Sequence, residues 1–116
     1  MDRIPDLPDE EWRPIEGYNS KYLVSNMGRV KSLKHANARL LTPFANNKGY
    51  DRVCLCRFGE AHHFLVSRLV AKAWCPNPDP EGCNTVDHID GDTKNNTASN
   101  LRWLSLQENM KRRYEK

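Results

Sequence analysis

Residues 86–110, VDHIDGDTKNNTASNLRWLSLQENM, carry the pattern that decides the fold of this chain. Asp87 and His88 follow a short apolar run, which places them where a strand leaves the core. Gly91 suits a tight turn, and the Asn and Asp residues around it suit an irregular loop held by side-chain hydrogen bonds to the backbone. Residues 101–104 alternate again, which predicts a second strand that returns beside the first.

The end of this stretch predicts a helix. Ser105 stands at the expected N-cap and Glu108 follows three residues later, which is the spacing of a capping box. Asn109 falls in the first turns of that helix. The predicted unit is therefore a strand, a long loop, a second strand and a helix.

The residues before this unit predict a β-rich half. Residues 1–10, rich in Pro and Asp, are expected to form a flexible lead-in. Short β-like runs separated by turn signals then follow at residues 12–15, 22–25, 29–33, 39–44, 50–58 and 61–66. From Val66 the apolar residues recur at three- and four-residue steps, which predicts a helix with Ser67 as its cap and an end before Pro76. The predicted class is α+β, with a small β-rich N-terminal half.

The charge distribution suggests a polyanionic partner. Residues 13–72 contain eleven Lys and Arg against three Asp and Glu, a net charge of +8, whereas residues 1–12 carry −4. A solvated basic face is the alternative explanation. No apolar run approaches the roughly 20 residues that span a membrane. The acidic N-terminus is unlike a signal peptide, so we expect a soluble intracellular protein without membrane contact.

The four cysteines raise the alternatives of disulfides and zinc. An intracellular location argues against disulfides. Cys54 and Cys56 share one face of a predicted strand, and seven residues separate Cys75 from Cys83, whereas zinc ribbons use two intervening residues. We therefore expect free thiols and no structural zinc.

The residue types alone do not decide whether the Asn- and Asp-rich loop is catalytic or structural. An EF-hand calcium loop fails, because counting from Asp87 puts Gly91 at position five instead of six and no Glu at position twelve. No Ser or Cys has a partner at a spacing typical of nucleophilic catalysis. A purely structural loop and a catalytic site both remain compatible with the residues.

Three blocks of the sequence, in the order of the family, resemble the HNH endonucleases, in particular the phage- and intron-encoded homing enzymes. The first block is VDHIDG (86–91) with NN at 95–96, NLRW at 100–103 and EN at 108–109. The second, SRLVAKAWCPNP, resembles the helix and Pro-rich link that precede this motif. The third, EEWRPIEGYNSKYLVSNMGRVKSL, resembles a small Trp/Gly nuclease-associated module.

The resemblance implies a ββα-metal core with a catalytic site. By position, His88 resembles the general base that takes a proton from water. Asp87 and Asn109 resemble the protein ligands of one ion, Mg²⁺ or Mn²⁺, and Asn100 resembles the residue that fixes the loop and orients the histidine. Many HNH enzymes carry His at the last motif position, and Asn109 matches the homing subgroup instead.

The resemblance also implies an organisation and a function. It assigns residues 11–58 to the β-rich module and residues 59–116 to the HNH domain. The implied function is metal-dependent hydrolysis of phosphodiester bonds in double-stranded DNA, by a monomer that nicks one strand, in the cytoplasm of a bacterial host or encoded by a phage. The alternative is a non-catalytic DNA-binding or phage packaging accessory protein that kept the HNH fold.

Basic side chains near the motif and in the β-rich half are the candidates for contacts to DNA phosphates. They are Arg29, Lys31, Lys34, Arg39, Arg102, Lys111, Arg112 and Arg113. Homing enzymes of this type continue into a DNA-reading helical module, whereas this sequence ends at MKRRYEK. We therefore expect low sequence specificity, or a reading module supplied elsewhere.

Overall fold

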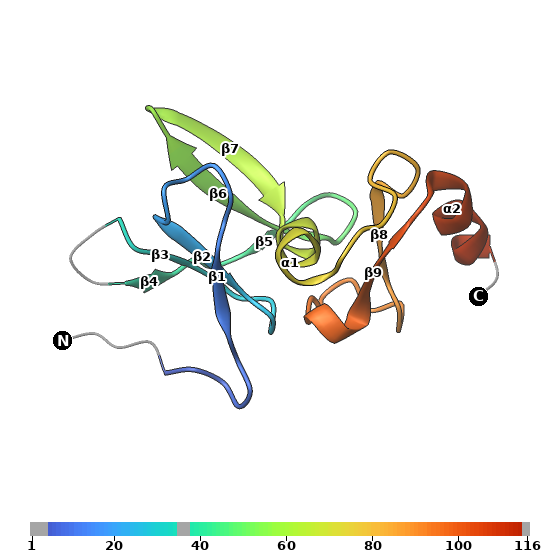
Figure 1. The fold of residues 1–116 in the computed structure, drawn as a ribbon, viewed down its shortest axis with the longest axis horizontal. Helices are drawn as coiled ribbons and strands as arrows, with labels where there is room; N and C mark the ends of the chain where they lie inside the picture. The colour runs from blue at the N-terminus through green and yellow to red at the C-terminus, as the bar shows by residue number, and fades with distance from the viewer. Residues whose placement is uncertain (1–4, 35–37, 115–116) are drawn as a thin grey trace.

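The computed structural model describes residues 5–34 and 38–114 and has the predicted α+β architecture. The described residues form a four-stranded sheet, a three-stranded sheet, a two-stranded ribbon and two α-helices. Helix α1 (Val66–Trp74) lies between the two larger sheets and the ribbon of β8 (Thr85–His88) and β9 (Leu101–Leu104) (Figure 1). Helix α2 (Leu106–Tyr114) lies on the other side of that ribbon (Figure 1). Neither helix is long and apolar enough to cross a bilayer.

The two larger sheets are antiparallel and follow the chain order. The first contains β1 (Trp12–Pro14), β2 (Tyr22–Ser25), β3 (Val30–Ser32) and β4 (Arg39–Leu40). The second contains β5 (Phe44–Ala45), β6 (Asp51–Arg57) and β7 (Glu60–Leu65). The predicted single run over 39–44 is wrong, because the chain leaves the first sheet after Leu40 and enters the second at Phe44. Pro43, which has no N–H for a sheet ladder, lies in the crossing.

The core joins both halves of the sequence. Val24 from β2, Val53 and Leu55 from β6, and Val66 and Val70 from α1 are each at most 1% exposed. Burial of one such side chain is worth about 1.5–3 kcal/mol, so this contact layer is the main source of stability. The β-rich module and the helix that leads to the HNH motif therefore share one hydrophobic core.

Helix α1 begins and ends where the apolar period predicts, but its predicted cap is wrong. The N-cap residue is Leu65, which makes no side-chain cap hydrogen bond, and Ser67 is buried within the first turn. The helix ends at Trp74, two residues before Pro76. The sequence predicts the apolar face of this helix correctly. Packing of that face, rather than a side-chain cap, holds the first turn.

The described part of the predicted flexible lead-in, residues 5–10, is instead anchored to the first sheet. Glu10 is 8% exposed and accepts hydrogen bonds from Arg29, with Nε 2.8 Å from Oε2, and from the Leu7 amide at 2.9 Å. Burial alone would raise the pKa of Glu10, but its hydrogen bonds with Arg29, Leu7 and Ser25 and the Arg29 charge lower this pKa to about 2. Residues 1–4 lie outside the described part.

The predicted boundary between residues 58 and 59 falls in the turn of the β6–β7 hairpin. The strands of this hairpin pair from Arg52 with Leu65 to Arg57 with Glu60. The division into two domains between residues 58 and 59 stays a prediction. The two strands of the hairpin lie on opposite sides of this boundary and pair with each other.

The turn between β2 and β3 packs against the loop that joins β8 and β9. Gly28 has φ +85°, and a Cβ at this position would lie 2.9 Å from the carbonyl oxygen of Asn96. The Ala98 amide donates to the carbonyl of Asn26 at 2.8 Å. Glycine is required here, because both the backbone conformation and the close approach exclude a side chain.

The ribbon and α2 form the predicted strand, loop, strand and helix. Asp87 lies opposite Arg102 in the β8–β9 register. Gly91 has φ +79°, as its turn requires. The capping box is confirmed, since the Glu108 amide donates to Ser105 Oγ and the Ser105 amide donates to Glu108 Oε1, each at 3.1 Å.

Candidate active site

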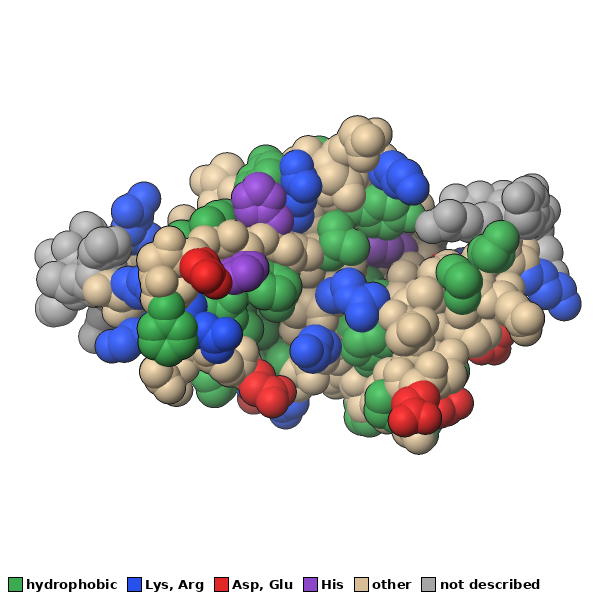
Figure 2. Space-filling model, turned by 90° about the horizontal axis from the view of Figure 1, so that it is seen from above, with side chains coloured by type: hydrophobic (Ala, Val, Ile, Leu, Met, Phe, Trp, Pro, Cys, Tyr) green, Lys and Arg blue, Asp and Glu red, His purple; other side chains and the backbone are tan. Residues whose placement is uncertain are grey.

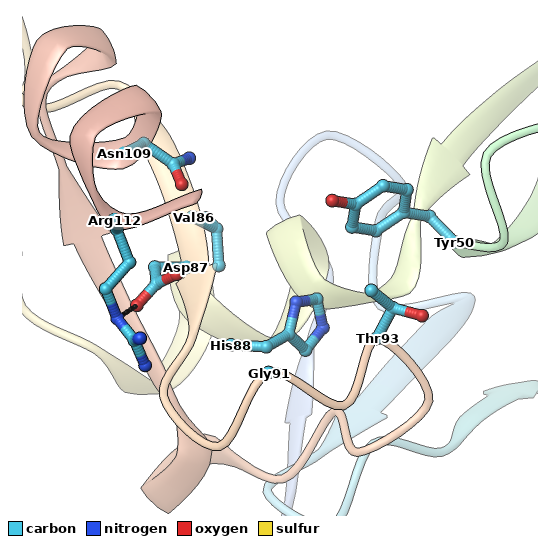
Figure 3. Close-up of a pocket in the computed structure, with 8 residues that line it drawn as sticks. All are labelled: Tyr50, Val86, Asp87, His88, Gly91, Thr93, Asn109 and Arg112. Atoms are coloured by element: carbon cyan, nitrogen blue, oxygen red, sulfur yellow. Dashed lines mark ion pairs between the residues drawn. The ribbon is translucent and has the colours of Figure 1, made fainter. Parts of the chain in front are cut away.

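One small pocket brings together the side chains at the end of β8, in the loop that follows it and on α2. Asp87 and His88 come from β8, and Asn109 comes from α2, so three of the four predicted site residues line it (Figure 3). The remaining lining residues are Tyr50, Val86, Gly91, Thr93 and Arg112.

His88 is held by a buried amide. The imidazole is 6% exposed, and its Nε2 lies 2.7 Å from Oδ1 of Asn96, which is also 6% exposed. An amide oxygen only accepts hydrogen bonds, so this contact requires a proton on Nε2, and the lone pair of a neutral ring is then on Nδ1. No hydrogen bond to Nδ1 is made within the described part of the chain. The ring lies between Tyr50 on one side and Asp87 and Asn109 on the other (Figure 3).

Asn96 is a site residue that sequence reasoning missed. The Asn95–Asn96 pair belongs to the motif, but its spacing does not indicate which amide faces the histidine. Gly28 approaches the backbone of Asn96 from the β-rich half and thereby helps to place it. Asn96 is therefore next to His88 in the C-terminal half of the chain and next to Gly28 in the β-rich half.

Asp87 is paired with two arginines through one of its oxygens. Its Oδ2 lies 2.9 Å from Nε of Arg102, across the ribbon, and 3.5 Å from Nε of Arg112, on α2. Arg112 also donates to the carbonyl of Ile89. Among the described residues no contact of this kind is made to Oδ1, which leaves that oxygen available to a cation.

Asp87 and Asn109 fit a hard divalent cation. A carboxylate and an amide supply oxygen donors, and both line the pocket that contains His88. Mg²⁺ characteristically binds through one or two protein carboxylates and keeps several waters or phosphate oxygens as its other ligands. No group of three or more His, Cys, Asp or Glu among the described residues could hold a metal ion, and the four cysteines are free thiols.

Asn100 holds the loop, and its side-chain hydrogen bonds go to Asp90 and Asn95 rather than to the histidine. Its Oδ1 accepts from the Asp90 amide at 3.0 Å, and its Nδ2 donates to Asp90 Oδ1 and to the Asn95 carbonyl, each at 2.9 Å. Hydrogen bonds from Asn95, from the Asp92 amide and from Asn100 lower the pKa of Asp90. These contacts fix the loop geometry, while the predicted orienting contact to His88 is made by Asn96 instead.

The β-rich half contributes Tyr50 to the pocket. Its ring centroid lies 5.9 Å from that of His88. Thr93 Oγ1 donates to the Gly49 carbonyl at 3.0 Å, and Lys94 Nζ pairs with Asp51 at 2.6 Å, so the loop after β8 is tied to the start of β6. No local signal marks Tyr50, because only these long-range contacts bring it to His88.

The basic residues of the β-rich half that are expected to contact DNA differ in the contacts that they already make within the protein. Arg29 is committed to the ion pair with Glu10. Lys34 donates to the carbonyl of Cys56, and the Lys31 ammonium lies 4.1 Å from the Trp12 ring centroid. Arg39 is exposed on β4.

Of the candidate basic residues in β9 and α2, Arg112 lines the pocket. Arg102 and Arg112 both pair with Asp87. Lys111 is exposed on α2. Arg113 belongs to α2, but its side chain lies outside the described part. Their contacts with DNA stay predictions.

The chain resembles known nucleases over most of its length. Residues 10–56 match the NUMOD4 motif, and residues 65–111 match the HNH endonuclease family. The DNA endonuclease I-HmuI of Bacillus phage SP01 is 40% identical over 100 residues, which cover 86% of this chain and 55% of that protein. An HNH endonuclease of Acanthamoeba polyphaga mimivirus, L247, is 39% identical over 104 residues, which cover 87% of this chain and 25% of that protein.

A solved structure shows the same fold. It concerns DNA binding and cleavage by the HNH homing endonuclease I-HmuI, and it superposes with a TM-score of 0.81 and 38% identity. The match covers 90% of this chain and 58% of that one, so this chain spans little more than half of its phage relative. The resemblance stated from the motif blocks is thus confirmed: the chain belongs to the HNH endonuclease family, with a NUMOD4 motif ahead of its HNH domain.

Proposed function

We propose that this protein is a divalent-metal-dependent DNA endonuclease that hydrolyses phosphodiester bonds. The observation that carries the proposal is the pocket in which His88, Asp87 and Asn109 meet. The family and the names of its relatives, a DNA endonuclease and a homing endonuclease described with DNA binding and cleavage, support DNA as the substrate.

His88 acts as the general base in this proposal. Hydrolysis forms a bond between a water oxygen and phosphorus, breaks the bond to the leaving oxygen and releases the water proton. Nδ1 of His88 takes that proton, because the hydrogen bond to Asn96 occupies Nε2. Asn96 is thus a positioning residue, which selects the ring nitrogen that faces the reacting water. Asn100 keeps the loop after His88 in place through its hydrogen bonds to Asp90.

Asp87 and Asn109 would hold the ion, and Mg²⁺ or Mn²⁺ suits their oxygen donors. When bound, such an ion stabilises negative charge that develops on the phosphoryl and leaving oxygens. Arg102 and Arg112 neutralise Asp87 through Oδ2 and keep its carboxylate directed at the pocket. In this proposal their guanidinium groups also contact a DNA phosphate beside the site.

We further propose that the protein nicks one strand of duplex DNA per encounter as a monomer. The pocket in which His88, Asp87 and Asn109 meet can act on one phosphodiester at a time. The competing function, a DNA-binding or packaging accessory without catalysis, would keep DNA affinity and lack cleavage.

Nicking of supercoiled plasmid tests the proposal. The full chain is incubated with Mg²⁺, with Mn²⁺ or with EDTA, and conversion to the open-circular form is measured. We expect metal-dependent nicking, lowered by about 10²–10⁴-fold in His88→Ala. His62→Ala is the matched control, because His62 is exposed on β7, away from the pocket. DNA binding without nicking, or equal rates for His88→Ala and wild type, would contradict the proposal.

A further inference from the structure

The β6–β7 hairpin ends in a turn whose backbone does not suit its first residue. Arg57 pairs with Glu60, so the turn consists of Phe58 and Gly59, which have φ +52° and +75°. Two central residues with positive φ define a type I′ turn, which strongly favours Asn-Gly. A bulky aromatic residue in this region is strained, and such strain is concentrated at functional sites.

Phe58 gains no burial in return for this strain. Its side chain is 88% exposed, the highest value among the large hydrophobic residues of the described part, where Leu106 follows at 60%. Its ring contacts the neighbouring Arg57, whose guanidinium carbon lies 5.4 Å from the Phe58 centroid. A ring that is both strained and exposed contributes nothing to the core, which makes it a candidate for contact with another molecule.

The surroundings of the ring favour a polyanion with flat apolar faces. The Arg57 guanidinium is fixed beside the ring by a hydrogen bond to the Gly17 carbonyl, and the Lys34 ammonium is fixed on the Cys56 carbonyl in the same strand. Figure 2 looks down on the side of the molecule toward which the hairpin rises in Figure 1, and it shows several basic side chains there, with apolar and some acidic ones among them. Nucleic acid combines phosphate charge with stacked bases, and exposed aromatic side chains contact such bases by stacking or insertion.

We propose that Phe58 is a DNA contact that inserts beside a base step of the bound duplex, while Arg57 and Lys34 contact its phosphates. The inference rests on the proposed function, because it takes the substrate of the pocket as its ligand. It adds a second, remote contact, at the tip of a hairpin whose strands pair along their full length.

The distance along β6 predicts where the contact falls. Tyr50 lines the pocket, and β6 runs from Asp51 to Arg57 toward the tip. At about 3.3 Å per residue, Phe58 lies roughly 26 Å from Tyr50 along the strand. A duplex that follows β6 rises about 3.4 Å per base pair, so the unstacked step lies about eight base pairs from the cleaved bond.

Fluorescence of 2-aminopurine tests the inference. The base analogue is placed in turn at each position within about 12 base pairs of a mapped nick, and full-length protein carrying His88→Ala is added in EDTA so that the duplex stays intact. We expect a fluorescence increase about eight base pairs from the nick, on one side only. Affinity is measured on the same duplexes by anisotropy.

Substitution of Phe58 separates its use in DNA binding from its effect on the fold. Phe58→Asn suits the type I′ turn, so we expect an equal or higher melting temperature together with loss of the fluorescence increase and at least about fivefold weaker binding. Phe58→Trp keeps a stacking surface and should keep both signals. Unchanged fluorescence and affinity in Phe58→Asn would overturn the inference while leaving His88-dependent nicking intact. Failure of the parent protein to bind any duplex would overturn the inference and the proposed function together.

Discussion

Glu10→Gln should destabilise the protein, because it removes the buried carboxylate that anchors residues 5–10. The Glu10 side chain has no exposed surface, and its partner Arg29 is 22% exposed, so water screens this ion pair only weakly. Gln cannot neutralise the guanidinium. The variant therefore leaves the largely buried positive charge of Arg29 without its negatively charged partner.

The magnitude follows from the pKa of Glu10, which the fold lowers from 4.5 to about 2. A difference of about 2.5 units corresponds to about 3 kcal/mol, which in a domain of this size amounts to roughly 10 °C in melting temperature. Because the folded-state pKa is the lower one, this stabilisation is complete well above pH 4.5 and is lost as the pH falls toward 2. About 1.4 kcal/mol of it should be lost by pH 3.5.

Thermal unfolding at pH 7, 5 and 3.5 measures the effect, with Glu11→Gln as the matched control because Glu11 is adjacent and exposed. We expect Glu10→Gln to melt well below wild type at pH 7, and the gap to narrow by close to half at pH 3.5. Glu11→Gln should follow wild type throughout. Equal melting temperatures for the two variants, or a gap that does not narrow in acid, would refute the anchoring of residues 5–10 by Glu10.

Three further predictions concern the site. Asn96→Ala should lower nicking and change the ¹⁵N shifts of the His88 ring toward a mixture of tautomers. Asn96→Asp keeps an acceptor oxygen and should keep Nε2 protonated. Identical ring shifts in Asn96→Ala and wild type would contradict the positioning role of Asn96. Gly28→Ala should lower both stability and nicking, because its Cβ would meet the Asn96 carbonyl at 2.9 Å. Melting and nicking assays measure both, and nicking at the wild-type rate in a destabilised Gly28→Ala variant would contradict the role of this contact in placing Asn96. Asn109→Ala should require a higher Mg²⁺ concentration for half-maximal nicking and bind Mg²⁺ more weakly by calorimetry, and an unchanged Mg²⁺ titration would remove Asn109 from the ligand set.

Local patterns in the sequence are enough to place the strand, loop, strand and helix of residues 85–114. Strand alternation, the turn at Gly91 and the capping box of Ser105 with Glu108 each depend on residues a few positions apart. Steric and hydrogen-bonding preferences act over that range, so they can be seen in the sequence. The resemblance to the HNH motif implied Asp87 and Asn109 as a pair, and both line the same pocket.

The tertiary structure alone decided which groups complete the site. Tyr50 reaches His88 because Thr93 and Lys94 bind the start of β6, more than 40 residues earlier in the chain. Asn96, rather than its neighbour or Asn100, holds the imidazole, since the packing of Gly28 against its backbone sets the direction of the loop. In the same way, the pairing of Glu10 with Arg29 anchors to the first sheet a segment that was expected to be flexible. Periodicity and capping describe neighbours along the chain, whereas these contacts depend on how separate elements pack around the shared core, and no local pattern records that arrangement.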